Sequence, residues 1–472
     1  MPKESFDLVV RNAQIATASE QYRADIGIVG GKITQIGAQL GAGTHEIDAS
    51  GRVVTPGGVD AHCHLDQPME PPAKMADNFD SGTRSAACGG TTTVIPFAAQ
   101  QKGQSLLAAV EDYHQRAAGM AHVDYAFHLI VSDPTPEVLN KELPALIAQG
   151  YTSFKIYMTY EDMKLDDIEI LNVLAVARAH KALTMIHAEN ADCIEWLTRR
   201  LEAAGHTAPR FHAHSRPMLV EREATHRAIS LAELVDTPIL IVHVSGREAV
   251  EQIRWARAHG LNILAETCPQ YLFLTADDLG LDDQYEGARC ICSPPPRDRA
   301  NQEVIWHALS DGLFAVFSSD HAPFTYEGSD GKHPDGSQAS FRYIPNGIPG
   351  IETRMALLFS EGVLGGRITL EKFVELIATN PAKAYGLHPR KGSISIGADA
   401  DLVIWEEGEF TITNQNLHHA VDYTPYEGMH LRAWPAITLS RGRVIWDGQF
   451  HPAREHGQFL PCDAPSIFAR IG

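Results

Sequence analysis

Histidine, lysine and aspartate side chains occur in five short apolar segments, at positions where they could bind metal ions. Imidazole and carboxylate groups suit zinc, and a site with an open coordination position suits catalysis. One such histidine alone is more often structural, but five polar sites in five similar segments are difficult to explain by packing. The candidate metal-site residues are His62, His64, Lys155, His187, His243 and Asp320.

Lys155 is the most informative of these residues because it lies inside the apolar segment TSFKIYM. A buried lysine is costly unless it is neutralised or paired. Two metal ions about 3.5–4 Å apart need a bridging anion to offset their repulsion, and an ammonium group cannot serve. A lysine that has reacted with CO2 becomes a carbamate, which is a two-oxygen anion. Lys155 is therefore the candidate bridge of a two-metal site.

The elements that must position these residues form a repeating pattern from Gly58 onward. Short apolar segments alternate with amphipathic helical stretches, which predicts an α/β fold with a (β/α)8 TIM-like barrel. Active sites of such barrels lie at the C-terminal ends of the strands, where the candidate residues fall. We expect strands at 58–65, 91–97, 124–131, 152–160, 182–189, 238–245, 262–269 and 314–321, and helices at 105–119, 136–150, 168–181, 193–205 and 247–260.

Both ends of the chain have a different pattern, with short alternating strands and Gly-rich turns. We expect them to combine in one small β-sandwich domain, the N-terminal half from residues 1–56 and the C-terminal half from 386–450. The catalytic barrel then spans 57–385. The polar, proline-containing tail, 451–472, is expected either to lie along the surface or to reach a neighbouring subunit.

Composition excludes several classes of protein. The formal net charge of the 472 residues is −20, so we expect no nucleic-acid partner. No segment approaches the roughly 20 apolar residues of a membrane span, so we expect no membrane partner. The N-terminus lacks a signal peptide, and the seven cysteines form no C-x-x-C pair. Both observations favour a cytoplasmic protein with reduced thiols.

The ordered motifs resemble the dihydropyrimidinase/D-hydantoinase family of the amidohydrolase superfamily. The similarity extends over nearly the whole chain and includes NPAKAYGL near residue 380. An isolated His-x-His pair is a weak signal, whereas the ordered set is specific. The motifs are VDAHCHLDQP, TSFKIYMTY, MIHAEN, IVHVSG, CSPPPR, SSDHAP and PNGIPGIE.

The resemblance implies two zinc ions per subunit and a homotetramer. One zinc would be held by His62, His64 and Asp320, and the other by His187 and His243. Carbamylated Lys155 would bridge the two ions. The resemblance also implies substrate contacts, with Tyr160 donating to the oxyanion and the backbone groups of Ser293 and Asn346 holding the amide edge of the ring.

The function that these features imply is a zinc-dependent cyclic amide hydrolase. It would open a dihydropyrimidine or 5-substituted hydantoin ring to an N-carbamoyl (ureido) acid, without an organic cofactor. Asp320 would take a proton from the attacking water and return it to the departing nitrogen. Tyr160 would stabilise the tetrahedral oxyanion.

The identity of the ring is less constrained. Related enzymes that open dihydroorotate typically have an arginine where this chain has Asp66, and a carboxylate would repel an anionic substrate. We therefore expect a neutral cyclic amide, with a cyclic imide or allantoin as alternatives. Met69, in the first barrel loop, is either an apolar pocket wall or simply packing. Non-catalytic scaffold proteins of this family lose metal ligands, whereas all six positions are filled here.

Overall fold

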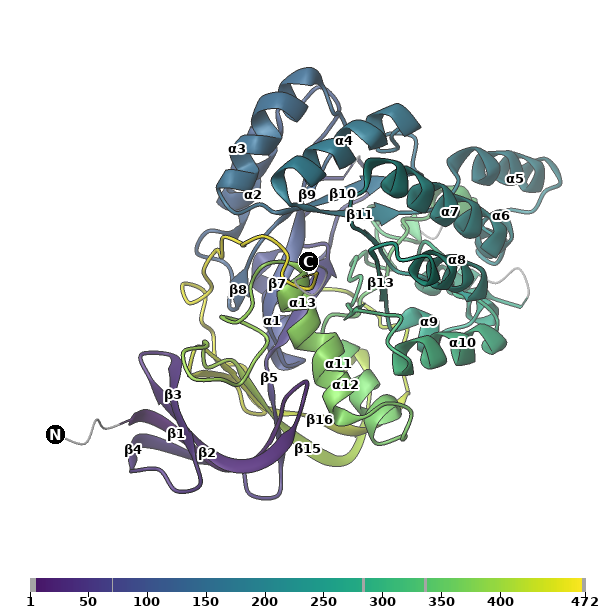
Figure 1. The fold of residues 1–472 in the computed structure, drawn as a ribbon. Coiled ribbons are helices and arrows are strands. Elements are labelled where there is room, and N and C mark those ends of the chain that lie inside the picture. The colour runs from purple at the N-terminus through teal and green to yellow at the C-terminus, as the bar shows by residue number, and fades with distance from the viewer. Residues whose placement is uncertain (1–5, 70, 282–284, 335–337, 469–472) are drawn as a thin grey trace.

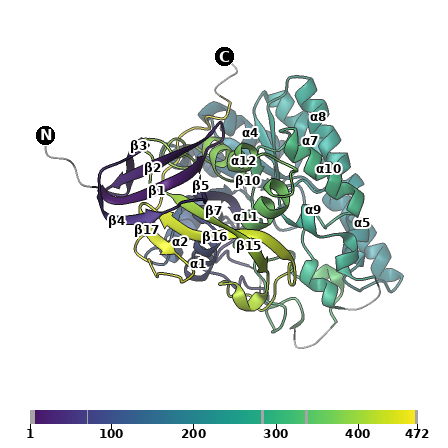
Figure 2. The same ribbon diagram turned by 90° about the horizontal axis from the view of Figure 1, so that it is seen from below.

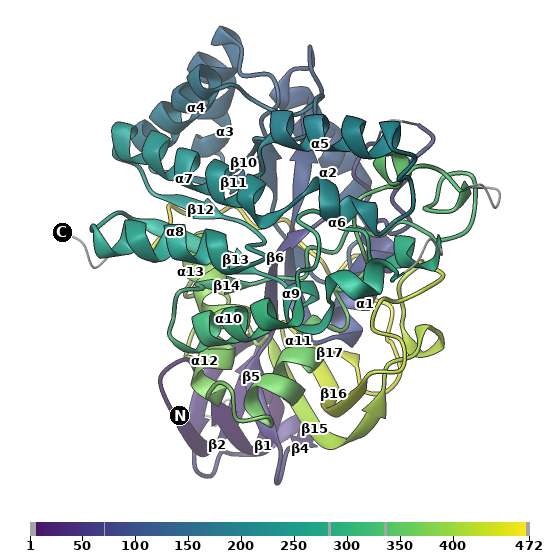
Figure 3. The ribbon, with the colours of Figure 1, turned by 90° about the vertical axis from the view of Figure 1, so that its right-hand side faces the viewer.

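Two β-sheets organise the chain: a parallel barrel and, to one side of it, a second sheet (Figures 1 and 3). The structure is a computed structural model and describes residues 6–69, 71–281, 285–334 and 338–468. Within these residues, no helix is long and apolar enough to cross a membrane. The seven cysteines are free thiols, as the sequence predicts.

The barrel contains the eight predicted strands in chain order, each parallel to its neighbours. Two short pieces, β8 and β9, together make the third strand. A parallel bridge between Cys63 and His321 joins the last strand to the first. Every strand is buried, which explains why the sequence has apolar runs here rather than alternation. The strands are β6 (Gly58–Cys63), β7 (Thr91–Ala99), β8 (Asp124–Tyr125), β9 (His128–Ile130), β10 (Ser153–Tyr157), β11 (Leu183–His187), β12 (Ile239–Ile241), β13 (Ile263–Thr267) and β14 (Val316–Phe317).

Helices surround the barrel (Figure 1). The described helices of the first half are α1 (Phe79–Cys88), α2 (Leu106–Ala117), η1 (Val138–Glu142), α3 (Leu143–Ala148), α4 (Asp167–His180), α5 (Ala191–Ala203), α6 (Phe211–Ser215) and α7 (Met218–Val235). Those of the second half are α8 (Arg247–Ala258), α9 (Gln270–Phe273), η2 (Ala276–Leu279), η3 (Tyr285–Cys290), α10 (Arg299–Ser310), η5 (Phe341–Tyr343), α11 (Arg354–Leu357), η6 (Leu358–Val363), α12 (Leu370–Val374), η7 (Glu375–Thr379), α13 (Asn380–Ala384) and η8 (Asn414–Asn416).

Local signals start these helices and tertiary packing holds them. In α4, for example, the side chain of Asp166 accepts from the backbone N–H of Glu169, and Glu169 reciprocates. This capping box satisfies donors that the first turn leaves free. The apolar face of α4, including Val173, then packs against the barrel in the main hydrophobic core. The longest described helix, α7, is not among the stretches that the sequence analysis names.

The second sheet combines both ends of the chain, as predicted, and forms a separate domain (Figure 2). Its central junction is the antiparallel pair of β5 and β15, in which Val54 is opposite Ile404. The strand order is β17-β16-β15-β5-β1-β2-β3, with β4 paired to β1. The strands are β1 (Phe6–Ala16), β2 (Gln21–Val29), β3 (Lys32–Gly37), β4 (Gly43–Asp48), β5 (Val53–Pro56), β15 (Leu402–Thr411), β16 (His430–Ser440) and β17 (Arg443–Trp446).

The tail after β17 returns to the barrel of its own chain. The backbone N–H of Leu460 donates to the carbonyl of Tyr125 at 2.7 Å, and that of Cys462 donates to Gly150 at 2.9 Å. These partners lie at the N-terminal ends of the strands. Leu460 is fully buried there, in one cluster with Leu183 and other strand residues. The tail therefore covers the end of the barrel opposite to the predicted site.

Candidate metal and catalytic site

The six predicted metal-site residues meet at the C-terminal end of the barrel. Three of them lie on β6, β10 and β11, and the other three follow the ends of β6, β12 and β14 by one to three residues. Each is buried, with at most 9% of its surface exposed. The set is His62, His64, Lys155, His187, His243 and Asp320.

Three of these residues form a compact group of ligand atoms. One atom each from His62, His64 and Asp320 lies within 4.8 Å of the other two. The Oδ1 atom of Asp320 is 3.2 Å from His62 Nε2 and 3.6 Å from His64 Nε2. Two imidazoles and a carboxylate are a donor set that suits zinc.

Lys155 and the other two histidines lie beside this group. The Nζ atom of Lys155 is 3.3 Å from His62 Nε2. His187 Nδ1 and His243 Nε2 are 3.0 Å apart, and the ring centroids of His62 and His243 are 5.5 Å apart. Burial lowers the pKa of Lys155 to about 8, because the interior disfavours its charged form.

The outer ring nitrogens of three histidines are held by side-chain oxygens. His62 Nδ1 donates to Glu266 Oε1 at 2.7 Å, and His64 Nδ1 donates to Gln67 Oε1 at 2.6 Å. His187 Nε2 donates to Glu189 Oε2 at 2.8 Å. Metal-ligating histidines almost always donate their second N–H in this way, which leaves the inner nitrogen unprotonated. The arrangement therefore fits bound metal.

Glu266, on β13, contacts the predicted site residues but is not among them. It also accepts from the backbone N–H of His243 at 3.1 Å, so it contacts both halves of the site. Burial raises its pKa to about 8. The signal that singled out Lys155, a charged residue inside an apolar strand, applies equally to Glu266 in NILAETCP. Gln270 was also missed, and its Nε2 donates to Asp320 Oδ2 at 3.4 Å.

Tyr160 lies next to the second histidine pair, with its ring 5.4 Å from that of His187. Burial raises its pKa to about 12, and a hydrogen bond with Ser293 offsets part of the rise. The phenol is therefore protonated at neutral pH and can donate a hydrogen bond. The loop that carries Asn346 lies against the loop of Ser293, because Gly347 N donates to Ile291 O at 3.1 Å. Within the described residues, the buried Oδ1 of Asn346 has no hydrogen-bond partner.

Three of the site residues have left-handed backbone conformations. The φ angles are 64° at Tyr160, 36° at His243 and 49° at Asp320. Residues other than glycine seldom adopt such angles, and each costs about 1–3 kcal/mol. Strain of this kind concentrates at functional sites, where the surrounding structure imposes it.

Asp66 has a basic partner in the structure. Its Oδ1 is 3.2 Å from Nη1 of Arg116, a residue of α2. Arg116 also pairs with Asp112, with 2.7 Å between Nε and Oδ2, so this group of three side chains keeps a net negative charge. The repulsion of an anionic substrate by Asp66 therefore stays a prediction. Met69 packs against a small cluster of Met75, Ala322 and Phe324, so packing is the role that the structure shows for it.

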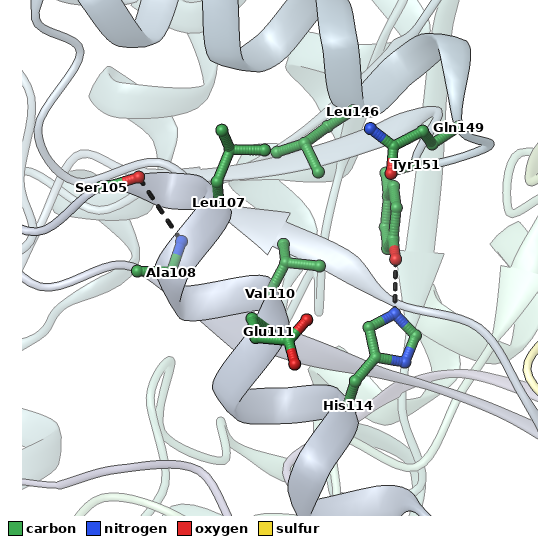
Figure 4. Close-up of a pocket in the computed structure, with 9 residues that line it drawn as sticks. All are labelled: Ser105, Leu107, Ala108, Val110, Glu111, His114, Leu146, Gln149 and Tyr151. Atoms are coloured by element: carbon green, nitrogen blue, oxygen red, sulfur yellow. Dashed lines mark hydrogen bonds between the residues drawn. The ribbon is translucent and has the colours of Figure 1, made fainter.

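A hollow of about 680 Å³ lies away from this chemistry, between α2 and α3 (Figure 4). Across it, His114 Nε2 and the hydroxyl of Tyr151 form a hydrogen bond. None of the predicted site residues lines it. The hollow is bordered by Ser105, Leu107, Ala108, Val110, Glu111, His114, Leu146, Gln149 and Tyr151.

Comparison with known proteins gives a consistent set of relatives. The amidohydrolase family model matches residues 53–445. The chain is 45% identical to a D-hydantoinase of Rhizobium radiobacter over 456 residues, which cover 96% of this chain and 98% of the relative. A solved D-hydantoinase structure superposes with a TM-score of 0.94 at 43% identity, covering 98% of this chain and 100% of the other. The crystal structure of the dihydropyrimidinase from Brevibacillus agri NCHU1002 superposes with a TM-score of 0.93 at 41% identity, covering 97% of this chain and 98% of the other.

Proposed function

This chain belongs to the amidohydrolase family, in the group of D-hydantoinases and dihydropyrimidinases, and from that membership we propose that it is a two-zinc hydrolase of neutral cyclic amides. It is a cyclic amidohydrolase that opens hydantoin-type rings. The proposed substrates are 5-substituted hydantoins and dihydropyrimidines. The observation that carries the proposal is the convergence of four histidines, a lysine and an aspartate on one buried centre.

Two groups of residues would hold the metals. His62, His64 and Asp320 would bind one ion and His187 and His243 the other, with Lys155 bridging them as a carbamate. The lowered pKa of Lys155 supports this modification, because the free amine is the form that attacks CO2. When bound, the metals would supply Lewis acidity and lower the pKa of a water molecule toward neutrality.

The residues of the chain would carry out the proton transfers. Asp320 takes a proton from the attacking water as its oxygen adds to the ring carbonyl. Tyr160 donates a hydrogen bond to the oxyanion that develops there, a contribution often worth about 3–4 kcal/mol. Asp320 then gives the proton to the ring nitrogen as the C–N bond breaks. The backbone groups of Ser293 and Asn346 hold the amide edge of the ring, and the product is an N-carbamoyl acid.

A substrate panel combined with elemental analysis tests this proposal. The panel contains hydantoin, phenylhydantoin, dihydrouracil, allantoin, dihydroorotate and succinimide, and ring-opening absorbance measures turnover. We expect turnover of the hydantoins or dihydrouracil and about two divalent metals per chain. Active enzyme with one metal or none would contradict the two-metal site. Metal-replete protein that opens only dihydroorotate or succinimide would contradict the substrate assignment.

The proposal also includes the setting of the enzyme. We place the enzyme in the cytoplasm and propose that it is a homotetramer. Light scattering after size-exclusion chromatography tests the oligomeric state, and a monomer would contradict it. For domain boundaries we keep 1–56 and 386–450 for the two-ended β domain, 57–385 for the barrel and 451–472 for the tail. In support, β5 ends at Pro56 and β6 begins at Gly58.

A further inference from the structure

Lys332 is a fully buried lysine that the mechanism above does not use. It lies in the segment between β14 and η5. Its Nζ donates to two main-chain carbonyls, that of Ile291 at 2.8 Å and that of Pro345 at 2.9 Å. The side chain therefore connects two loops that are more than fifty residues apart in the sequence.

These two carbonyls belong to the loops that hold the proposed substrate contacts. Ile291 is two residues before Ser293, and Pro345 immediately precedes Asn346. The carbonyl of Ile291 also accepts from Gly347 N at 3.1 Å, so it receives hydrogen bonds from both Lys332 and the Asn346 loop. The three segments thus meet at one junction next to the site.

The chemistry of this junction favours a positioning role over simple packing. Burying an amine costs free energy, and carbonyl oxygens offset that cost only in part. Burial accordingly lowers the pKa of Lys332 to about 7. An apolar side chain would fill the same space at lower cost, but it could not hydrogen-bond both loops. The lysine therefore fixes the separation between the Ile291 and Pro345 loops.

We propose that Lys332 is a positioning residue, whose amino group holds the Ser293 and Asn346 loops at the separation that the amide edge of the substrate requires. This inference rests on the proposed function. Lys332 has no described hydrogen bond to a metal-site residue, so its loss should weaken substrate binding and leave the metal site intact.

Lys332→Met tests the proposal because methionine keeps much of the stem and removes the donors. With a hydantoin as substrate, we expect KM to rise about 10- to 100-fold. The carbonyl of Pro345 loses the donor described for it, and the direct connection between the two loops through the amino group is lost. We expect kcat to stay within about threefold, since the lost interaction contributes to binding rather than to the transition state alone. The metal content should equal that of the wild type.

Tyr285→Phe is the matched control. The hydroxyl of Tyr285 donates to the backbone carbonyl of Lys332 at 3.0 Å, so this variant loosens the same segment without removing the amino group. Its KM should stay within about twofold of the wild type, because neither loop loses a hydrogen bond. An equal rise of KM in both variants would overturn the proposal, since the segment as a whole would then be responsible.

Two further outcomes decide the matter. An unchanged KM in Lys332→Met, or a loss of kcat and metal together, would overturn the positioning role. If Lys332→Met does not fold, Lys332→Gln replaces it. Its shorter side chain should not restore both hydrogen bonds, so KM should again rise above that of the wild type, and an unchanged KM would overturn the proposal. Failure of the proposed function looks different, because the wild type itself would then turn over neither hydantoins nor dihydrouracil.

Discussion

The side chains at the centre of the site are oriented by partners on their outer sides. Asp320 shows this directly: Oδ1 faces His62 and His64, whereas Oδ2 accepts from Gln270. Both oxygens are thereby fixed in buried surroundings. A carboxylate held in this way is already oriented for proton transfer, so it does not have to reorient before each transfer.

Asp320→Asn should therefore abolish most of the activity. The amide cannot accept the proton, and we expect turnover to fall roughly 10³-fold or more, with a smaller effect on the urea midpoint. Activity, metal content and unfolding are measured on the same preparation. Asp236→Asn, at an exposed helix end, is the control and should behave as wild type. Near-normal turnover with two metals in place would contradict the proton-transfer role of Asp320.

Lys155→Ala should lose metal and activity together, because the bridging anion disappears. Small carboxylic acids such as acetate should restore part of both by supplying an anion in the vacated space. Lys155→Arg should not be restored, since a guanidinium stays charged and fills the gap. Elemental analysis and turnover with increasing acetate measure the effect. Full metal occupancy in Lys155→Ala without added acid would show that no bridge from this residue is needed.

The residues predicted from the sequence lie together in the structure, whereas the residues that contact them from outside were not predicted. Lys155 was identifiable because a charge inside an apolar strand is conspicuous. Lys332 was not, because GSDGKHPDG has the composition of a solvated loop. The partner of Asp66, Arg116, was not predictable either, because it is fifty residues away in the sequence. Long-range partners of this kind follow from the folded arrangement, and a single sequence contains no signal for them.

At the scale of elements, the barrel strands could be predicted because nearly all of their residues are buried, and they appear as short apolar runs. Two helices end without the glycine that usually marks a helix end. Both α4 and α7 end at a residue with φ 57°, Lys181 and Asp236 respectively, where glycine is the usual choice. The folded structure imposes this conformation on residues that do not favour it.

Lys181→Gly should stabilise the protein slightly. A non-glycine side chain in this conformation destabilises the folded state by about 1–2 kcal/mol. Glycine removes this cost, but about half of the gain is lost because glycine makes the unfolded chain more flexible. We expect a net gain of up to about 1 kcal/mol, measured as a higher urea midpoint. Glu251→Gly, at an exposed position inside α8, is the contrasting control and should lose about 1 kcal/mol. A lower midpoint for Lys181→Gly would show that the lysine side chain makes a stabilising contribution.

At the scale of the whole molecule, the barrel depends on segments outside it. The tail covers the end of the barrel opposite to the site, and Leu460 is completely buried there. Lys391 connects the two sheets in a similar way: its Nζ is 2.6 Å from Asp124 of β8 and 2.7 Å from Asp401, which directly precedes β15. The two sheets are therefore expected to unfold together.

Leu460→Ala should test the contribution of the tail. Removing a buried leucine side chain typically costs about 2–5 kcal/mol, because a cavity remains. We expect a lower urea midpoint and an unchanged KM, since the site lies at the other end of the barrel. Glu455→Ala, an exposed change in the same tail, should stay within about 0.5 kcal/mol of the wild type. Equal midpoints for both variants would mean that the tail adds little to stability.

The pairing of β5 with β15 also has a consequence for how the chain is made. A ribosome adds about 5–20 residues per second, so β15 emerges roughly 20–70 s after β5. During that interval the edge of β5 that pairs with β15 has no partner, and the apolar cluster around Val54 lacks the residues that the C-terminal strands supply. An exposed apolar edge is prone to aggregate or to recruit chaperones. We therefore expect the yield of soluble enzyme to depend on the speed of translation and on chaperone supply more strongly than the stability of the finished molecule would suggest.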